Sequence, residues 1–99
     1  MPIIKLLKHA ELEFIDACAW YEKQQKGLSV KFRMSLRTSL NFVFLNPKLY
    51  SKKYDTDQYF APMRKFPYIM VYWYDENLDT IFVTSIFHTK RNPRKFESE

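Results

Sequence analysis

Hydrophobic residues dominate two stretches in the second half of the chain, residues 63–74 and 80–88, with few polar side chains on either predicted face. Both stretches are rich in β-branched and aromatic residues, a composition typical of strands in a packed sheet. The acidic connection at residues 75–79 contains asparagine and aspartate, which tolerate the backbone angles of tight turns. The pattern predicts an antiparallel hairpin at the centre of a sheet.

The first part of the chain predicts a strand followed by a helix. An apolar run at residues 3–7 favours a buried strand. From about residue 9 to residue 25, hydrophobic side chains recur every three or four residues among charged ones, as in an amphipathic helix. The residues expected on its core-facing side are Leu12, Ile15, Cys18 and Ala19. Free cysteine is often buried, which agrees with a structural role for the thiol.

A second helix is predicted from Ser29 to about residue 45. Gly27, the only glycine, is expected to end the first helix in the left-handed conformation, and Ser29 is expected to cap the second. Pro47 ends this helix, because the residue before a proline avoids the helical region. Arg33 and Arg37 fall on an exposed face. The residues of the expected apolar stripe are Phe32, Leu36, Leu40, Val43 and Phe44.

The remaining pattern completes a fold prediction. Residues 46–57 show no clear period and are expected to form a loop, and a further strand is predicted from Tyr59 to about residue 65. We therefore predict an α+β fold of order β-α-α-β-β-β. In it, a two-helix hairpin packs on one face of a mainly antiparallel four-stranded sheet. No repeat or linker interrupts the pattern, so residues 1–99 are expected to form a single domain.

The distribution of charge narrows the choice of partner. The net charge is +5, and basic residues concentrate in residues 26–65 and 88–95, whereas residues 66–87 contain no lysine or arginine. A fold that joins the two basic segments would suit nucleic acid or an acidic protein, although a solvated basic face is the alternative. Lys52 and Lys53 stand among tyrosines. That mixture fits phosphates and bases, but it also fits tyrosines that cover the edge of a core.

Composition also argues against several kinds of site. No apolar run approaches the roughly 20 residues of a membrane span, the N-terminus lacks a signal-peptide pattern, and a lone cysteine fits a reducing cytosol. A cytoplasmic location without membrane association is therefore expected. The two histidines and the cysteine lack metal-ligand spacing, and a single glycine cannot make a phosphate-binding loop. No metal and no cofactor are expected, and His9 is expected to be merely exposed.

The order of elements and several local motifs resemble the RelE/ParE superfamily of toxins from bacterial type II toxin–antitoxin modules. The resemblance runs over essentially the whole chain. The residues that carry it are Ala10, Trp20-Tyr21-Glu22, Gln25, Gly27-Leu28, Phe32, Asn46-Pro47, Arg64, Phe66-Pro67-Tyr68, Tyr72, Phe87-His88 and Lys90-Arg91-Asn92-Pro93. None of these motifs is diagnostic alone, but their order and spacing together are specific.

The resemblance implies a small basic toxin that a cognate antitoxin protein neutralises. RelE-like members cleave mRNA on the ribosome, whereas ParE-like members inhibit DNA gyrase without catalysis. RNA cleavage needs a base, an acid and cations that stabilise the phosphate charge. The resemblance implies that His88 acts as acid or base, with Arg64 and Arg91 as the stabilising cations. The residues expected to contact nucleic acid are Lys52, Lys53, Lys90, Arg33 and Arg37.

Two departures from the family pattern keep other functions open. Many ribonuclease members have an arginine shortly before the tyrosine that matches Tyr72, and a tyrosine where this chain has Thr89; this chain has neither. A ParE-like gyrase inhibitor, or a toxin that retains only antitoxin binding, is therefore an alternative. His88 can instead cap the end of the sheet, and Arg64 can pair with an acid such as Asp75 or Asp79 in a structural role.

Overall fold

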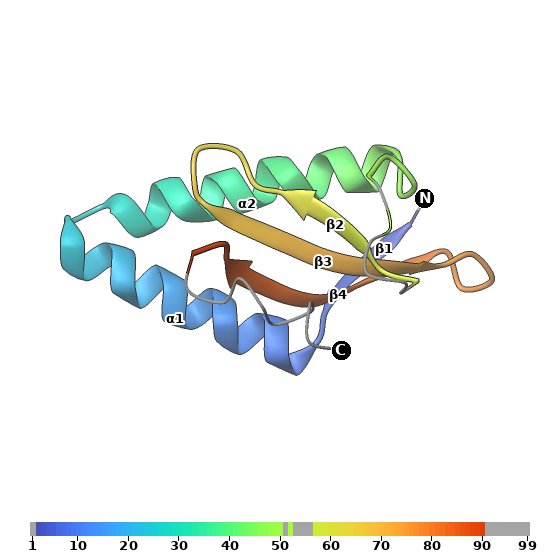
Figure 1. The fold of residues 1–99 in the computed structure, drawn as a ribbon, viewed down its shortest axis with the longest axis horizontal. Helices are drawn as coiled ribbons and strands as arrows, with labels where there is room; N and C mark the ends of the chain where they lie inside the picture. Colours follow the sequence, from blue (N-terminus) through green and yellow to red (C-terminus); the bar gives the residue numbers. More distant parts are fainter. Residues whose placement is uncertain (1, 51, 53–56, 91–99) are drawn as a thin grey trace.

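The computed structural model describes residues 2–50, 52 and 57–90, and Figure 1 shows their arrangement. The predicted order of strands and helices is confirmed. The elements are β1 (Ile3–Leu6), α1 (Lys8–Gln24), α2 (Leu28–Leu45), β2 (Tyr59–Pro62), β3 (Tyr68–Asp75) and β4 (Thr80–His88). Within the described part of the chain, no helix is both long enough and apolar enough to cross a membrane.

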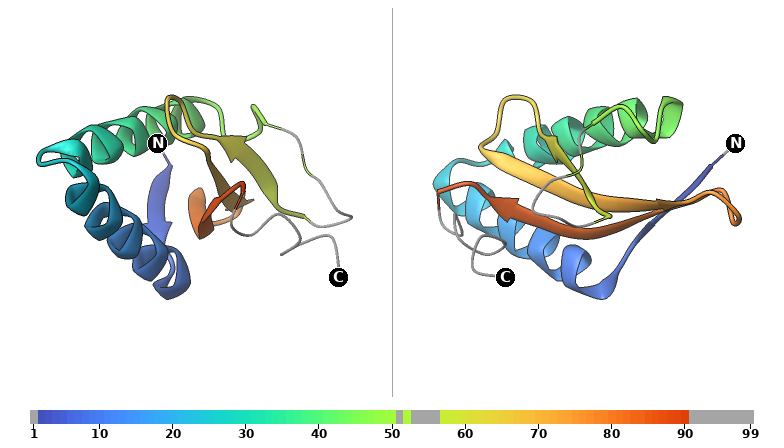
Figure 2. Two further views of the ribbon diagram at one scale, coloured as in Figure 1. Left: turned by 60° about the vertical axis from the view of Figure 1, so that its left-hand side comes forward. Right: turned by 45° about the vertical axis from the view of Figure 1, so that its right-hand side comes forward.

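The four strands form one mixed sheet in the order β1-β4-β3-β2. β3 and β4 make the predicted antiparallel hairpin and occupy the two central positions. β2 pairs antiparallel with β3, and β1 pairs parallel with β4. The two helices diverge in a V from the turn between them and lie on one face of this sheet, as the two views in Figure 2 show. The predicted α+β architecture is therefore confirmed.

The core lies between the helix layer and the sheet, and it is dense in aromatic rings. Phe32 of α2 is fully buried. Its ring centre lies 6.0 Å from that of Phe14, 5.2 Å from Tyr21, 5.1 Å from Phe66 and 5.0 Å from Tyr68. Aromatic pairs at such separations contribute about 0.5–1.5 kcal/mol each beyond the area they bury. These rings tie both helices to β3 and to the loop before it.

A buried tyrosine joins the loop after α2 to the sheet. The Tyr72 hydroxyl donates a hydrogen bond of 2.8 Å to the carbonyl of Pro47, and its ring stacks on Tyr59 with centres 5.2 Å apart. Burial raises the pKa of Tyr72 far above its ordinary value, so the hydroxyl is a neutral donor. The chain directly after α2, at Pro47, is thereby held against β3.

The prediction of a buried first strand is wrong. β1 lies at one edge of the sheet, its residues alternate between exposed and half-buried, and Ile3 is 56% exposed. An edge strand has one hydrogen-bonded neighbour and, in this fold, one covered face. Its apolar residues therefore cannot all reach the core, although the run looked uniformly hydrophobic in the sequence.

The core-facing side predicted for α1 is wrong in part. Leu12 and Ile15 are 48% and 51% exposed and Ala19 is exposed as well. α1 instead buries Ala10, Ala17 and Tyr21. Both sets recur at helical spacing, so the hydrophobic period alone does not tell the two sides apart. The small alanines suit the inner side because they let the helix approach the sheet closely.

The stripe predicted for α2 is confirmed. Its fully buried members are Phe32, Leu36 and Val43, and its half-buried members are Leu40 and Phe44. Cys18 of α1, expected in the core, is half-buried against it, and this burial raises the pKa of the thiol. A raised pKa keeps the sulfur in its unreactive thiol form.

The turn between the helices departs from its prediction. Gly27 does adopt the left-handed conformation, with φ 87°, but it directly precedes α2 and so caps that helix instead of ending α1. Ser29 lies inside the first turn of α2 and is not its cap. The Glu22 carboxylate accepts the backbone N–H groups of Gly27 (3.0 Å) and Ser29 (3.2 Å) and the Ser29 hydroxyl (2.7 Å). These bonds hold the pKa of Glu22 below its usual range.

Glu13 of α1 completes the sheet where β1 ends. β1 pairs with only the first part of β4, and the β3–β4 register then shifts, which leaves Thr84 as an extra residue on β4. Beyond this bulge the Glu13 carboxylate accepts the Ser85 hydroxyl (2.7 Å) and the Ile86 N–H (3.0 Å). A side chain from α1 thus takes the place of a strand partner along this part of β4.

Candidate functional site

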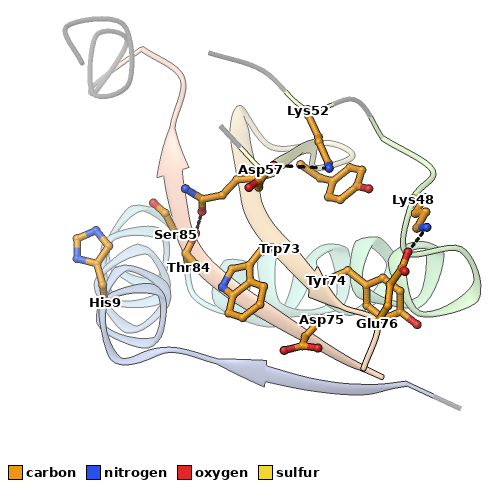
Figure 3. A pocket seen from close by; sticks show the side chains of 12 residues that line it. His9, Lys48, Lys52, Asp57, Trp73, Tyr74, Asp75, Glu76, Thr84 and Ser85 are labelled. Atoms are coloured by element: carbon orange, nitrogen blue, oxygen red, sulfur yellow. Dashed lines mark hydrogen bonds and ion pairs between the residues drawn. The ribbon is translucent and has the colours of Figure 1, made fainter. Parts of the chain in front are cut away.

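A hollow of about 980 Å³ lies on the face of the sheet away from the helices. Figure 3 shows that Trp73 projects into the middle of this hollow. The Trp73 ring stacks on Phe82 of the neighbouring strand, with ring centres 4.5 Å apart and planes at 19°. Both rings are half-buried, and Trp73 lines the hollow. Beside them, the Thr84 hydroxyl donates a hydrogen bond to the side-chain carbonyl of Gln58.

Two lysines line the same hollow, each beside a carboxylate. Lys48 forms an ion pair with Glu76 in the turn after β3, and this contact raises the pKa of Lys48. The ammonium nitrogen of Lys52 lies 3.9 Å from the Asp57 carboxylate and 5.3 Å from the centre of the Tyr59 ring. Both pairs are exposed and therefore weak, so an anionic ligand can take the place of either carboxylate.

His9 lies at one rim of the hollow, on the first turn of α1. Its Nε2 is 3.2 Å from the same Glu13 oxygen that accepts Ser85 and Ile86. The prediction that His9 is exposed is correct, but its place beside the hollow was not foreseen. The spacing of His9 and Glu13, four residues apart on a helix, is a signal that could have found the pair.

His88 lies elsewhere, in a second groove between α1 and the end of β4. Its ring meets Tyr68 edge-on, with centres 5.1 Å apart, and its Nδ1 accepts the backbone N–H of Lys90 at 3.0 Å. The bond to Lys90 is the contact expected if His88 caps the end of the sheet, the alternative given in the sequence analysis. It makes Nδ1 an acceptor, so a neutral His88 carries its proton on Nε2. Asp16 and Trp20 line the same groove.

Arg64 lies in a third place, on the connection between β2 and β3. Its guanidinium stacks 4.8 Å above the ring of Phe42 in α2, and its backbone carbonyl accepts the Ser35 hydroxyl. Asp75 and Asp79 were the acids considered as its partners. Asp75 instead accepts the N–H of Leu78 within the β3–β4 turn, and Asp79 accepts the Tyr74 hydroxyl. Arg64 is therefore packed on the helix layer.

The predicted site residues are thus distributed over the molecule. Lys52 lies at the hollow, whereas His88 and Arg64 line two grooves that share no residue with it or with each other. Arg33 and Arg37 lie on the outer side of α2, and Lys90 is exposed just after β4. Lys53 and Arg91 fall outside the described residues.

In the part of the chain that the structure describes, no group of three histidine, cysteine or acidic side chains is placed so that it could bind a metal ion. The residues missed by sequence reasoning are Gln58, Trp73, Phe82 and Thr84, together with His9. In the sequence, the two aromatic rings were indistinguishable from core residues of the hairpin.

Comparison with solved structures identifies the fold. Neither protein-family models nor curated proteins give a match to the sequence. Among solved structures, a chain of the intact E. coli RelBE toxin–antitoxin complex is similar with a TM-score of 0.69 and 19% sequence identity. The match covers 92% of this chain and 100% of that chain. The chain therefore has the RelE fold, and the resemblance found in the sequence is confirmed at that level.

Proposed function

We propose that this protein is the toxin of a type II toxin–antitoxin pair, arresting growth of a bacterial cell and neutralised by a cognate antitoxin. The observation that carries the proposal is the structural match to a chain of the RelBE complex, which covers 92% of this chain. It agrees with the independent resemblance of the sequence motifs to the same superfamily and with the net charge of +5. An acidic antitoxin would suit that charge.

The action proposed is cleavage of mRNA on the ribosome, with the RNA strand bound across the hollow. Single-stranded RNA is held mainly by stacking of bases on aromatic side chains and by cations at the phosphates. Trp73, backed by Phe82, offers such a stacking surface, and Lys48 and Lys52 stand beside it. The sequence also assigns Lys53, Lys90, Arg33 and Arg37 to nucleic-acid contacts, and these remain predictions.

Two histidines are candidates for the acid or base of cleavage. His88 is assigned by the resemblance, with Arg64 and Arg91 as cations. His9 is favoured by position, because it stands at the rim of the hollow with Glu13 against its Nε2. A carboxylate at one ring nitrogen orients an imidazole, leaving the other nitrogen to exchange a proton with substrate.

Inhibition of DNA gyrase without catalysis is the second candidate. Two observations favour it: His88 and Arg64 line separate grooves, and β3 carries no lysine or arginine. A binding inhibitor needs no assembled acid, base and cation. In that case the same hollow and the basic surface would serve for contact only.

Expression of the chain from a tightly controlled promoter, with pulse labelling of protein and DNA synthesis, tests the proposal. Early loss of protein synthesis with transcripts cut within translated codons is the expected result. Early loss of DNA synthesis would instead support inhibition of gyrase. Absence of any growth arrest would refute the proposal that this chain is a toxin.

Comparison of His9→Ala with His88→Ala then identifies the catalyst. The variant that abolishes transcript cleavage while its melting curve stays that of the wild type marks the catalytic histidine. If both variants cleave normally, neither histidine is the acid or base.

A further inference from the structure

The groove beside Arg64 has a volume of about 780 Å³ and lies between α2 and the connection from β2 to β3. The charged residues that line it are Lys31, Arg64 and Lys65, with no acidic residue among them. All three side chains are exposed, and none forms an ion pair with any residue that the structure describes. Positive charge gathered in a groove without a counter-charge favours an anionic ligand. We call this place the basic groove.

The connection that carries two of these cations is fixed on both sides of Lys65. Before it, the Ser35 hydroxyl of α2 donates to the backbone carbonyl of Arg64, and the Arg64 guanidinium lies 4.8 Å from the centre of the Phe42 ring. After it, the ring of Phe66 packs into the aromatic core. Figure 1 shows this connection beside α2. The basic groove is therefore preformed, and a ligand that enters it does not have to order the chain first.

Lys65 adopts a backbone conformation that lysine rarely takes. Its φ is 70°, in the left-handed region, where a Cβ atom is crowded and glycine is preferred. Among the described residues, the other non-glycine residue with positive φ is Asp79, in the β3–β4 turn, where aspartate is well tolerated. Strained residues tend to lie at ligand sites. A lysine at a position where glycine would be more stable points to a binding role for its ammonium group.

The composition of the basic groove favours one kind of anion. Phe66, the aromatic residue that lines it, is half-buried against the core, so no ring is presented for a base to stack on, unlike Trp73 at the hollow. Double-helical RNA conceals the faces of its bases and is bound mainly through its phosphates and its shape. Its backbone supplies several phosphates at once, one for each cation. Arginine and lysine are the residues that bind phosphate, arginine through two parallel N–H groups.

We propose that the basic groove binds phosphates of a double-helical RNA backbone without reading its sequence. Lys31 and Lys65 each contact a phosphate as point charges, and Arg64 donates two N–H groups to another. The basic groove shares no residue with the hollow around Trp73. Duplex binding therefore requires neither cleavage nor growth arrest and does not rest on the proposed function. It gives Arg64 a role in binding, whereas the resemblance gives it one in cleavage.

The test measures binding of the full chain to a fluorescein-labelled RNA duplex of about 20 base pairs by fluorescence anisotropy. Lys31→Gln with Lys65→Gln should weaken binding by roughly tenfold. The slope of log affinity against log salt concentration should fall in magnitude by roughly 1–2, because two phosphate contacts are lost. Lys5→Gln with Lys8→Gln removes the same charge from exposed positions elsewhere and should leave the affinity within about twofold. Melting curves check that each variant is folded.

Substitution of Lys65 alone separates strain from binding. Lys65→Gly should raise the melting temperature by roughly 2–6 °C, because glycine adopts the left-handed region without strain. It should weaken duplex binding by roughly threefold or more, because the ammonium group is lost. Lys65→Ala is the matched control, since it removes the same ammonium group but keeps the Cβ atom. It should weaken binding by a similar factor without raising the melting temperature.

Four results would overturn the proposal. An equal loss of affinity in the Lys5 and Lys8 variant would mean that net charge alone attracts the duplex. Duplex binding by Lys65→Gly as tight as that of the wild type would remove the role of Lys65. Equally tight binding of a polyglutamate peptide, weakened by the same Lys31 and Lys65 substitutions, would assign the groove to an acidic protein.

The fourth result is binding of inorganic pyrophosphate without binding of the duplex, which would assign the groove to a free phosphorylated ligand. None of these measurements uses growth arrest. A failure of duplex binding and a failure of the toxin assay are therefore distinguishable.

Discussion

The two faces of the sheet are built from similar residues, but their side chains differ in how deeply they are buried. On the helix-covered face, Met70, Tyr72 and Val83 are fully buried and continuous with the aromatic cluster around Phe32. On the open face, Trp73 stacks on its neighbour but stays half-buried, and charged side chains at the hollow are paired only at the surface. The difference indicates that stability resides largely on one face, which leaves the other available for binding.

The open face is itself divided. Toward the end of β4, Phe60, Val71 and Phe87 form a small buried cluster of their own, with Ile69 packed against it. The hollow around Trp73 occupies the other end of the same face. A ligand-binding role is therefore proposed only for the end near the β3–β4 turn.

Removal of one aromatic ring from each face of the sheet gives the largest expected difference in the free energy of unfolding. Phe32→Ala deletes a fully buried ring and should lower the free energy of unfolding by about 3–5 kcal/mol. Phe82→Ala deletes a half-buried ring on the open face and should cost about 1–2 kcal/mol. Urea denaturation of both variants measures the difference, and equal losses would contradict the assignment of stability to the helix-covered face.

Glu13 supports the edge between the two faces, so its loss should have an intermediate effect. Glu13→Ala leaves the Ser85 hydroxyl and the Ile86 N–H without this acceptor and should cost about 1–3 kcal/mol. Glu11→Ala, two residues away and exposed, is the control and should change stability by less than about 0.5 kcal/mol. The same denaturation experiment applies; a neutral Glu13→Ala would show that the edge needs no such partner.

The smallest expected differences in stability come from substituting two exposed carboxylates, Glu22 and Glu76. Hydrogen bonds hold the pKa of Glu22 below its usual range, so its charged form stabilises the fold above the unfolded-state pKa. That contribution disappears as pH falls through the folded-state pKa. Glu22→Gln should lower the melting temperature slightly at neutral pH, and the gap to wild type should close in acid. Glu76→Gln, which removes an exposed pair with Lys48, should change nothing measurable.

Sequence patterns predicted the elements better than the burial of individual residues. The period of apolar residues was sufficient to place both helices and the central hairpin. It failed at α1, because Ala10 and Ala17 recur at the same spacing as Leu12 and Ile15, and only the shape of the interface with the sheet decides between them. It failed at Ile3, because position at a sheet edge is a property of the whole topology.

The candidate site was predictable only in fragments. Lys52 was found because its loop mixes lysines with tyrosines. Trp73 was not found, since in a strand that alternates between two faces a large aromatic residue on the open face looks like one in the core. His9 and Ser85 line the hollow from positions far apart in the sequence, and only the folded chain brings the two together.

The measurement that tests this account most directly is growth arrest by Trp73→Ala. If the open face is the working surface, this variant should need roughly tenfold more induction than the wild type to halve the growth rate, because loss of one stacked base weakens binding by about 1–3 kcal/mol. Trp73→Phe, which keeps a ring for stacking, should restore most of the effect. Full arrest by a folded Trp73→Ala would contradict the account, since the hollow would then be unnecessary for activity.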